Sequence, residues 1–137
     1  WDLNVEDTPL DGVIVNSSIN DYNSGVSISA FNSSFAALVD KIRIKQPTAK
    51  IVLLQSPRNT RDSKNYDQYG ETMNNIASAR ENVEYIPCPS SVWTTLDWVV
   101  GDVGHLTYSG RVAFATFIEE KLNLLFPCGF SQGVICS

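Results

Sequence analysis

The sequence predicts an α/β fold with a mainly parallel sheet. Short apolar runs that are typical of strands alternate along the chain with segments that have the apolar spacing of helices. The three runs occupy residues 13–15, 51–54 and 83–86. Strands that alternate with helices of this length form βαβ units, so the strands are expected to run parallel. The predicted order is strand, helix, strand, helix, strand, loop, helix.

The first predicted strand, residues 13–15, is a Val-Ile-Val run between polar segments, and we interpret it as buried. The helix that follows is expected to end at Pro47, because proline interrupts helical hydrogen bonding. The strand at residues 51–54 shows no alternation, which favours burial on both faces. The apolar positions of the helix are Phe31, Phe35, Leu38, Val39 and Ile42.

Tyr69, Met73 and Ile76 mark a second helix. Residues 90–100 are predicted to form a loop with a short helical turn. A last helix is expected to begin near Thr107, because threonine is a good N-cap residue. The side chains that this helix would bury are Phe114, Phe117, Ile118, Leu122 and Leu125.

Three strands make a thin sheet, and residues 13–15 are too apolar for an exposed edge, because open apolar edges invite pairing with other chains. We therefore expect one or more N-terminal strands of the sheet to be missing from this chain. The sequence also begins with Trp1 and not with methionine. This start favours a cleaved protein or a fragment.

The length of 137 residues suits one domain. We assign residues 1–127 to the α/β domain and residues 128–137 to a C-terminal tail. The net charge of −5, with the basic residues scattered, argues against a nucleic-acid partner, since phosphate binding needs clustered Lys and Arg. The apolar runs are too short to span a bilayer.

The three cysteines are Cys88, Cys128 and Cys136. A disulfide between Cys128 and Cys136 would close the short tail and stabilise an otherwise unconnected segment. Three free thiols in a reducing compartment are the alternative. With the disulfide formed, Cys88 is left free or pairs with another segment. No metal site is expected, because no Cys-x-x-Cys pattern and no histidine cluster accompany the cysteines.

The single histidine, His105, ends the segment Gly-Asp-Val-Gly-His, which places Asp102 three residues before it. An aspartate so close can accept a hydrogen bond from Nδ1 and leave Nε2 free as a general base. A lone histidine is more often a surface or core residue, and Asp-x-x-His is frequent by chance. The position of the pair after the third strand of an α/β array favours a catalytic role.

Asn20 follows the first strand in the run Ser-Ser-Ile-Asn-Asp-Tyr. A side-chain amide at the carboxyl end of a parallel strand can donate toward a developing oxyanion. The simpler explanation is a strand-to-loop turn, where Asn and Asp commonly satisfy local backbone groups.

Together these segments resemble two conserved blocks of the SGNH/GDSL family of serine hydrolases. Residues 13–21 are similar to the block in which a buried strand precedes Gly-x-Asn-Asp, and residues 102–110 to the Asp-x-x-His block that ends in a glycine entering the last helix. The resemblance implies a three-layer α/β/α, flavodoxin-like fold. It also implies that Asn20 is an oxyanion-hole donor, Asp102 the triad acid and His105 the triad base, with no cofactor.

The chain departs from the family in two ways. Ser18 stands where the family has glycine, and the Gly-Asp-Ser motif of the nucleophile is absent from the sequence. Ser17, Ser18 and Ser109 are substitutes with simpler explanations, namely turn chemistry and helix N-terminal polarity. We therefore predict that an N-terminal fragment or a separate chain supplies the nucleophilic serine.

The predicted function is ester hydrolysis through an acyl-enzyme, and the resemblance suggests an acetylated carbohydrate as substrate. Trp93 and Trp98 are weaker candidates for the substrate site, because large aromatic side chains more often simply pack. The alternative is a non-catalytic α/β domain that binds carbohydrate or serves assembly. A phosphate binder has little support, since no glycine-rich loop follows a strand. An extracellular, periplasmic or virion-surface location fits the predicted disulfide, and a cytoplasmic one stays open.

Overall fold

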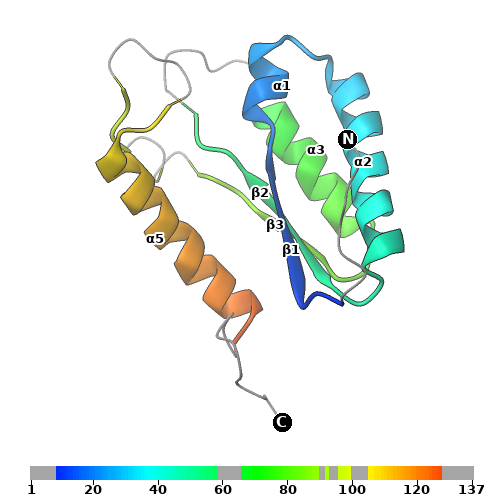
Figure 1. The fold of residues 1–137 in the computed structure, drawn as a ribbon. Helices are drawn as coiled ribbons and strands as arrows, with labels where there is room; N and C mark the ends of the chain where they lie inside the picture. Colours follow the sequence, from blue (N-terminus) through cyan, green and yellow to red (C-terminus); the bar gives the residue numbers. More distant parts are fainter. Residues whose placement is uncertain (1–8, 59–65, 90–91, 93–95, 100–104, 128–137) are drawn as a thin grey trace. The chain divides into compact units, whose positions relative to one another are not determined.

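The computed structural model describes residues 9–58, 66–89, 92, 96–99 and 105–127. The chain divides into two compact units, Trp1–Cys88 and Pro89–Ser137. Within the part that the structure describes, the first unit contains a three-stranded sheet and three helices, and the second contains one long helix (Figure 1).

The sheet of the first unit is formed by β1 (Gly12–Ser17), β2 (Lys50–Gln55) and β3 (Val83–Ile86). The strands pair in the order β1-β2-β3, and both pairs are parallel. In the register of β1 and β2, Val15 lies opposite Leu53. The predicted α/β fold with a parallel sheet is thus confirmed.

β2 and β1 differ in burial, and β2 is the strand with a hydrogen-bonded neighbour on each side. Residues 51–55 of β2 are buried, as the absence of alternation predicted. β1 pairs with β2 alone among the described strands, and its side chains alternate in exposure. Val13 and Val15 pack against the core, whereas Ile14 is 41% exposed. The prediction of a fully buried first strand was therefore wrong.

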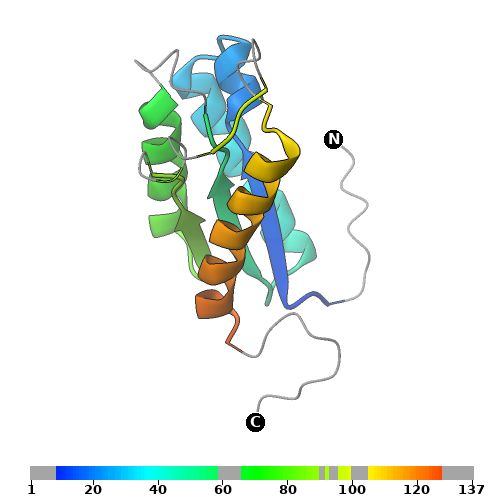
Figure 2. The same cartoon turned by 90° about the vertical axis from the view of Figure 1, so that its left-hand side faces the viewer.

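Two helices, α2 (Ile28–Lys45) and α3 (Tyr66–Ser78), lie side by side on one face of the sheet (Figures 1 and 2). Successive parallel neighbours joined by right-handed crossovers place their helices on the same face. The apolar face of α2 and that of α3 meet the inward side chains of the strands there. The buried core consists of Phe31, Phe35, Val39, Ile42, Ile51, Leu53, Tyr69, Met73, Ile76, Ala77 and Val83.

The ends of α2 are fixed by local hydrogen bonds. At its start the Ser27 side chain accepts from the amide of Ala30 at 3.2 Å. The helix ends where the amide of Gln46 bonds to the carbonyl of Ile42, directly before Pro47. The expected stop at this proline is confirmed.

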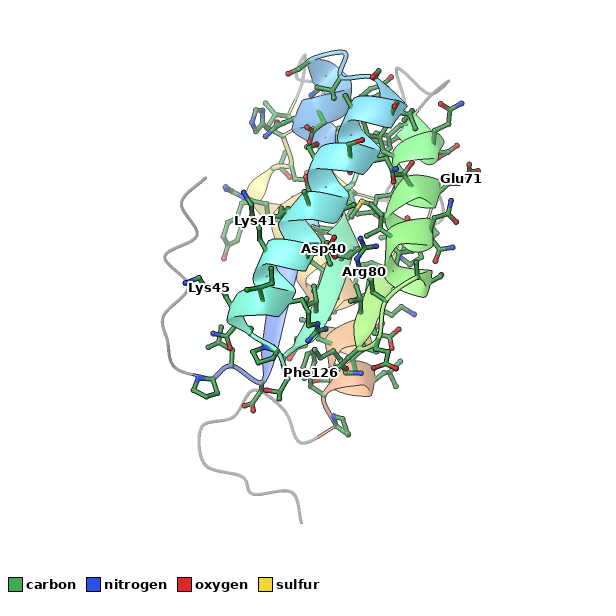
Figure 3. The ribbon with its side chains drawn as sticks, turned by 90° about the vertical axis from the view of Figure 1, so that its right-hand side faces the viewer. Asp40, Lys41, Lys45, Glu71, Arg80 and Phe126 are labelled. Carbon is green, nitrogen blue, oxygen red and sulfur yellow. The ribbon has the colours of Figure 1, made fainter. Side chains whose placement is uncertain are left out.

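Arg80, which follows α3, forms a two-point ion pair with Asp40 of α2 (Figure 3). Its Nε lies 2.7 Å from Oδ1 and its Nη2 3.1 Å from Oδ2. The same guanidinium donates to the carbonyl of Ile76. The pair therefore ties the two helices together at the surface.

A third helix of this unit, α1 (Ile19–Asn23), was not predicted from the sequence, which left a strand-to-loop turn as the simpler explanation of this segment. It is five residues long, and a helix this short has no apolar periodicity from which it could be predicted. Ser18, the residue before it, has a positive φ of 103°, and Tyr22 donates its amide hydrogen to the carbonyl of Ser18 at 3.0 Å. The chain thus turns from β1 directly into a helical turn.

The second unit contains α5 (Tyr108–Leu125). Thr107 is its N-cap, as predicted, and accepts from the amide of Gly110 at 3.1 Å. Phe114 is buried, but the expectation that four further apolar side chains are buried was wrong. Those four, Phe117, Ile118, Leu122 and Leu125, are half-buried.

Upstream of α5, the amide of Val92 donates to the carbonyl of Pro89 at 2.8 Å, within the segment predicted to be a loop with a short helical turn. No helix among the described residues is long and apolar enough to cross a membrane.

Candidate active site

Asn20, the predicted oxyanion donor, is the second residue of α1 and is exposed. It lies three residues past Ser17, where β1 ends, so it stands at the carboxyl end of a parallel strand. This is the edge at which open α/β sheets place their ligand sites.

The turn before Asn20 has an unusual backbone. Ser18 has φ 103° and ψ −38°, a region that favours glycine because a Cβ is crowded there. Ser18 is also 1% exposed. The chain thus adopts a glycine-type turn at the position where the resembled block has glycine, with a serine in that place.

Glycine would adopt the positive φ of this turn with less strain than serine. The Ser18 side chain instead forms a buried hydrogen bond with Tyr66. Tyr66 Oη donates to the carbonyl of Ser56 at 2.6 Å and lies 2.7 Å from Ser18 Oγ. A phenol has one hydrogen, and a carbonyl can only accept. The Ser18 hydroxyl is therefore the donor to Tyr66 Oη, and the Ser18–Tyr66–Ser56 chain of hydrogen bonds has one direction.

Further bonds join the same strand ends. Ser56 Oγ donates to Asn16 Oδ1 at 2.7 Å and approaches the carbonyl of Ser17 at 3.1 Å. The Ser17 hydroxyl faces Asp21 Oδ2 at 3.5 Å. These contacts connect the end of β1 with the segment after β2, and they fix the backbone from which Asn20 projects.

Burial raises the pKa of Tyr66 far above its usual value, and the hydroxyl of Ser18 opposes this shift. The Arg58 guanidinium lies 5.5 Å from the centre of the Tyr66 ring. It also lies 3.4 Å from Asp67 Oδ1. Tyr66 is therefore a neutral structural hydroxyl across the physiological pH range and does not act as a base toward Ser18.

Cys88 is a buried free thiol just beyond β3. Its amide donates to Gln55 Oε1 at 3.3 Å, and Tyr85 Oη donates to the same oxygen at 2.8 Å. Burial raises the pKa of the Cys88 thiol to about 12, so the thiolate is not populated near neutral pH. Cys88 is thus a packed, buried thiol with little thiolate character.

His105 lies in the second unit, and its side chain is exposed. Its carbonyl accepts from the amide of Val99 at 3.0 Å, and Trp98 forms an antiparallel bridge with Leu106. The amide of Thr107 donates to the carbonyl of Asp97 at 3.0 Å. Residues 97–99 and 105–107 therefore form a short antiparallel ladder that ends at the N-terminus of α5.

Side-chain hydrogen bonds of Asp97 join the two segments of this ladder at the end next to α5. Asp97 Oδ2 accepts from Thr107 Oγ1 at 2.9 Å and from Ser109 Oγ at 2.8 Å. The missing side chain of Gly110 makes room for Asp97, because a Cβ there would lie 2.2 Å from the Asp97 carbonyl oxygen. We call Asp97, Thr107, Ser109 and Gly110 the Asp97 clamp. It explains in physical terms why a glycine enters this helix.

The candidate substitute nucleophiles Ser17, Ser18 and Ser109 have structural partners. Ser18 is buried and donates to Tyr66, and Ser109 donates to Asp97. Hydrogen bonds from Ser109 and Thr107 hold the pKa of Asp97 below its usual value, which makes that carboxylate a weak base. The simpler explanations, turn chemistry and helix N-terminal polarity, fit these contacts.

Several predicted residues lie outside the described part of the chain. These are Asp102, Trp93, Cys128 and Cys136. Asn20 belongs to the first unit, and His105 and Trp98 belong to the second, where Trp98 is half-buried beside Leu106. No group of three or more His, Cys, Asp or Glu side chains within the described ranges is placed to hold a metal ion.

No protein-family model matches the chain, and no curated protein matches its sequence. Among solved structures, the chain is similar to the salicylyl-acyltransferase SsfX3 from a tetracycline biosynthetic pathway, with a TM-score of 0.64 and 18% identity. The match covers 88% of this chain, and the chain spans 39% of the length of that acyltransferase. At this identity the likeness concerns the fold, and it supports the α/β, flavodoxin-like class.

Proposed function

We propose that this chain supplies the acid and the base of a serine esterase or acyltransferase site of the SGNH/GDSL kind. The observation that carries the proposal is the position of His105. It lies in a ladder that runs into the N-cap of α5, and Asp102 stands three residues before it in the sequence. In the Asp-x-x-His block of the SGNH/GDSL family, the acid, the base and the last helix follow one another in the same order.

In the proposed reaction, Asp102 accepts a hydrogen bond from His105 Nδ1, and Nε2 takes the proton of a serine hydroxyl as its oxygen attacks the acyl carbonyl carbon. The tetrahedral intermediate collapses with cleavage of the ester C–O bond, and the alcohol leaves with the proton from Nε2. Water or a second alcohol then attacks the acyl-enzyme and regenerates the serine. The acceptor decides between hydrolysis and acyl transfer.

Asn20 is the proposed oxyanion donor. Its exposed amide follows β1 directly, on a turn that the Ser18–Tyr66–Ser56 hydrogen bonds fix. A donor is effective in catalysis when its position is set before charge develops, because no reorganisation is then needed in the transition state. The rigid turn supports this role.

The serine is proposed to come from a polypeptide segment outside these 137 residues, either an N-terminal fragment or a second chain. Ester substrates with a small acyl group, such as acetylated carbohydrates, fit the family that the chain resembles. The similar solved structure is named as a salicylyl-acyltransferase, so transfer to an alcohol is included. We place the reaction in an extracellular, periplasmic or virion-surface setting.

A non-catalytic domain for carbohydrate binding or assembly is the second candidate. It is favoured by one observation: the sequence contains no Gly-Asp-Ser motif. Under this alternative, His105 and Asn20 would be surface residues that take no part in catalysis.

Fluorophosphonate labelling separates the two candidates. The protein, with any further segments that accompany it in its native source, is treated with a biotinylated probe, and the adduct is mapped by mass spectrometry. We expect a labelled serine outside residues 1–137, lost in His105→Ala and strongly reduced in Asp102→Asn, with the exposed Asp11→Asn as matched control. No labelling in the wild type favours the binding domain. A labelled serine within these residues contradicts the proposed external nucleophile.

A further inference from the structure

We infer that Asp97 is a positioning residue for His105. The inference rests on the proposed function, in which His105 is the base. Asp97 stands eight residues before His105 in the sequence, yet the ladder brings the two segments together.

The backbone part of the argument is the ladder itself. The carbonyl of Asp97 accepts from the amide of Thr107, and the amide of Val99 donates to the carbonyl of His105, each at 3.0 Å. The bridge between Trp98 and Leu106 lies between these two bonds. The direction of the His105 Cα–Cβ bond therefore depends on the pairing of the two segments.

The side chain of Asp97 stabilises this pairing at the end next to α5. Its Oδ2 accepts from the hydroxyls of Thr107 and Ser109, and Thr107 Oγ1 also approaches the Asp97 carbonyl at 3.2 Å. Hydrogen bonds to a carboxylate are stronger than those between neutral groups, and a negative charge is favourable at a helix N-terminus. One carboxylate thus joins the ladder to the first turn of α5.

Gly110 makes the connection tight. The Asp97 carbonyl oxygen occupies the space that a Cβ at this position would need. Gly110 is itself buried and donates its amide hydrogen to Thr107 Oγ1. Loss of the Asp97 carboxylate should therefore loosen the ladder and broaden the orientations of His105, while the chemistry of the imidazole itself stays intact.

The first measurement uses the NMR signals of His105, which are assigned without ambiguity because the chain has one histidine. In the full chain, Asp97→Ala is expected to shift the ring proton signals and to speed exchange of the Thr107 amide about tenfold. Ser109→Ala, which removes one of the two hydroxyl donors, should have a smaller effect, and the exposed Asp11→Asn none. Unchanged ring signals and unchanged exchange in Asp97→Ala would overturn the inference.

The second measurement is the rate of fluorophosphonate labelling in the native protein. Under conditions in which urea unfolding shows each variant to be fully folded, Asp97→Asn should slow labelling several-fold, whereas Asp102→Asn should slow it far more. Labelling at the wild-type rate would overturn the positioning role, and a loss equal to that of Asp102→Asn would make Asp97 the acid instead. Absence of labelling in the wild type would refute the proposed function. The NMR signals of the His105 ring test the positioning role independently of that outcome.

Discussion

The hydroxyl of Ser18 donates its hydrogen to Tyr66 Oη, 2.7 Å away, and Tyr66 donates its own to the carbonyl of Ser56. Ser18 holds a positive φ of 103° in this position and is 1% exposed. A buried tyrosine from the start of α3 thus holds a strained turn at the end of β1. The backbone strain and the hydrogen bond to Tyr66 both involve Ser18. We therefore expect substitutions at Ser18 and Tyr66 to have non-additive effects on the free energy of unfolding.

Tyr66→Phe is expected to lower the free energy of unfolding by about 1–3 kcal/mol, because it leaves the Ser18 hydroxyl and the Ser56 carbonyl without their partner in a buried place. Urea unfolding measures this change. Tyr108→Phe is the matched control, since Tyr108 is 76% exposed, and should change the stability little.

Ser18→Gly should be nearly neutral, since relief of about 1 kcal/mol of backbone strain offsets the lost hydrogen bond. The cost of Tyr66→Phe should then be smaller in the Ser18→Gly background than in the wild type. Equal costs in the two backgrounds would contradict the coupling between these residues.

Stability should fall as the pH rises above about 9. Burial raises the pKa of Cys88 and that of Tyr85 each to about 12, and it raises the pKa of Tyr66 as well. The unfolded chain releases these protons near its ordinary values of 9.0 and 10.0, before the folded protein does. The folded state thus binds more protons there, and its stability decreases with pH.

The urea midpoint between pH 7.5 and 10.5 measures this decline. Cys88→Ala should make the curve flatter near pH 9, because it removes the group with the lowest unfolded pKa among the three. A midpoint that stays constant or rises across this range would show that these groups are not buried as described.

Gly110→Ala tests the close approach in the Asp97 clamp. In an ordinary helix the change to alanine is favourable by about 1 kcal/mol. Here the added Cβ would lie 2.2 Å from the Asp97 carbonyl oxygen, so we expect a loss of about 1–3 kcal/mol and faster exchange of the Thr107 amide. Ala113→Gly, at an exposed position of the same helix, calibrates helix propensity. A stabilised Gly110→Ala protein would disprove the contact.

The pair of Arg80 and Asp40 (Figure 3) should contribute modestly and depend on salt. Asp40 is largely exposed, so Arg80→Ala is expected to cost about 0.5–1 kcal/mol at low ionic strength and less at 1 M salt. The Arg80 hydrogen bond lowers the pKa of Asp40, so its stabilisation is present above the unfolded value of 3.8 and is lost as the pH falls below it. Arg80→Lys is the control that keeps the charge without the two-point geometry. A cost independent of salt and pH would contradict an electrostatic role.

Most of the fold could be predicted from the sequence because its signals are local. The spacing of Phe31, Phe35, Val39 and Ile42 marks α2, and the unbroken apolar run of β2 marks a strand that is buried on both faces. α1 was missed because five residues carry no period. The exposure of Ile14 was missed because an apolar run does not reveal which positions of a strand are covered.

The candidate site was predicted less fully, since its contacts are distant in sequence. Asp97 is ten residues from Thr107, and no short motif links an aspartate to a hydroxyl across that separation. Tyr66 and Ser18 are 48 residues apart. Ser18 did offer one signal: a serine in place of the glycine of the resembled block indicates a turn that needs a compensating contact.

The acid–base pair is tested most directly by the tautomer of His105 in ¹⁵N NMR spectra at alkaline pH, where an imidazole is neutral. If Asp102 accepts from Nδ1, the wild-type ring carries its proton on Nδ1, and Asp102→Ala shifts it toward Nε2, the commoner form of free histidine. Asp11→Asn should leave the spectrum unchanged. A wild-type ring protonated on Nε2, with the same spectrum in Asp102→Ala, would contradict the account.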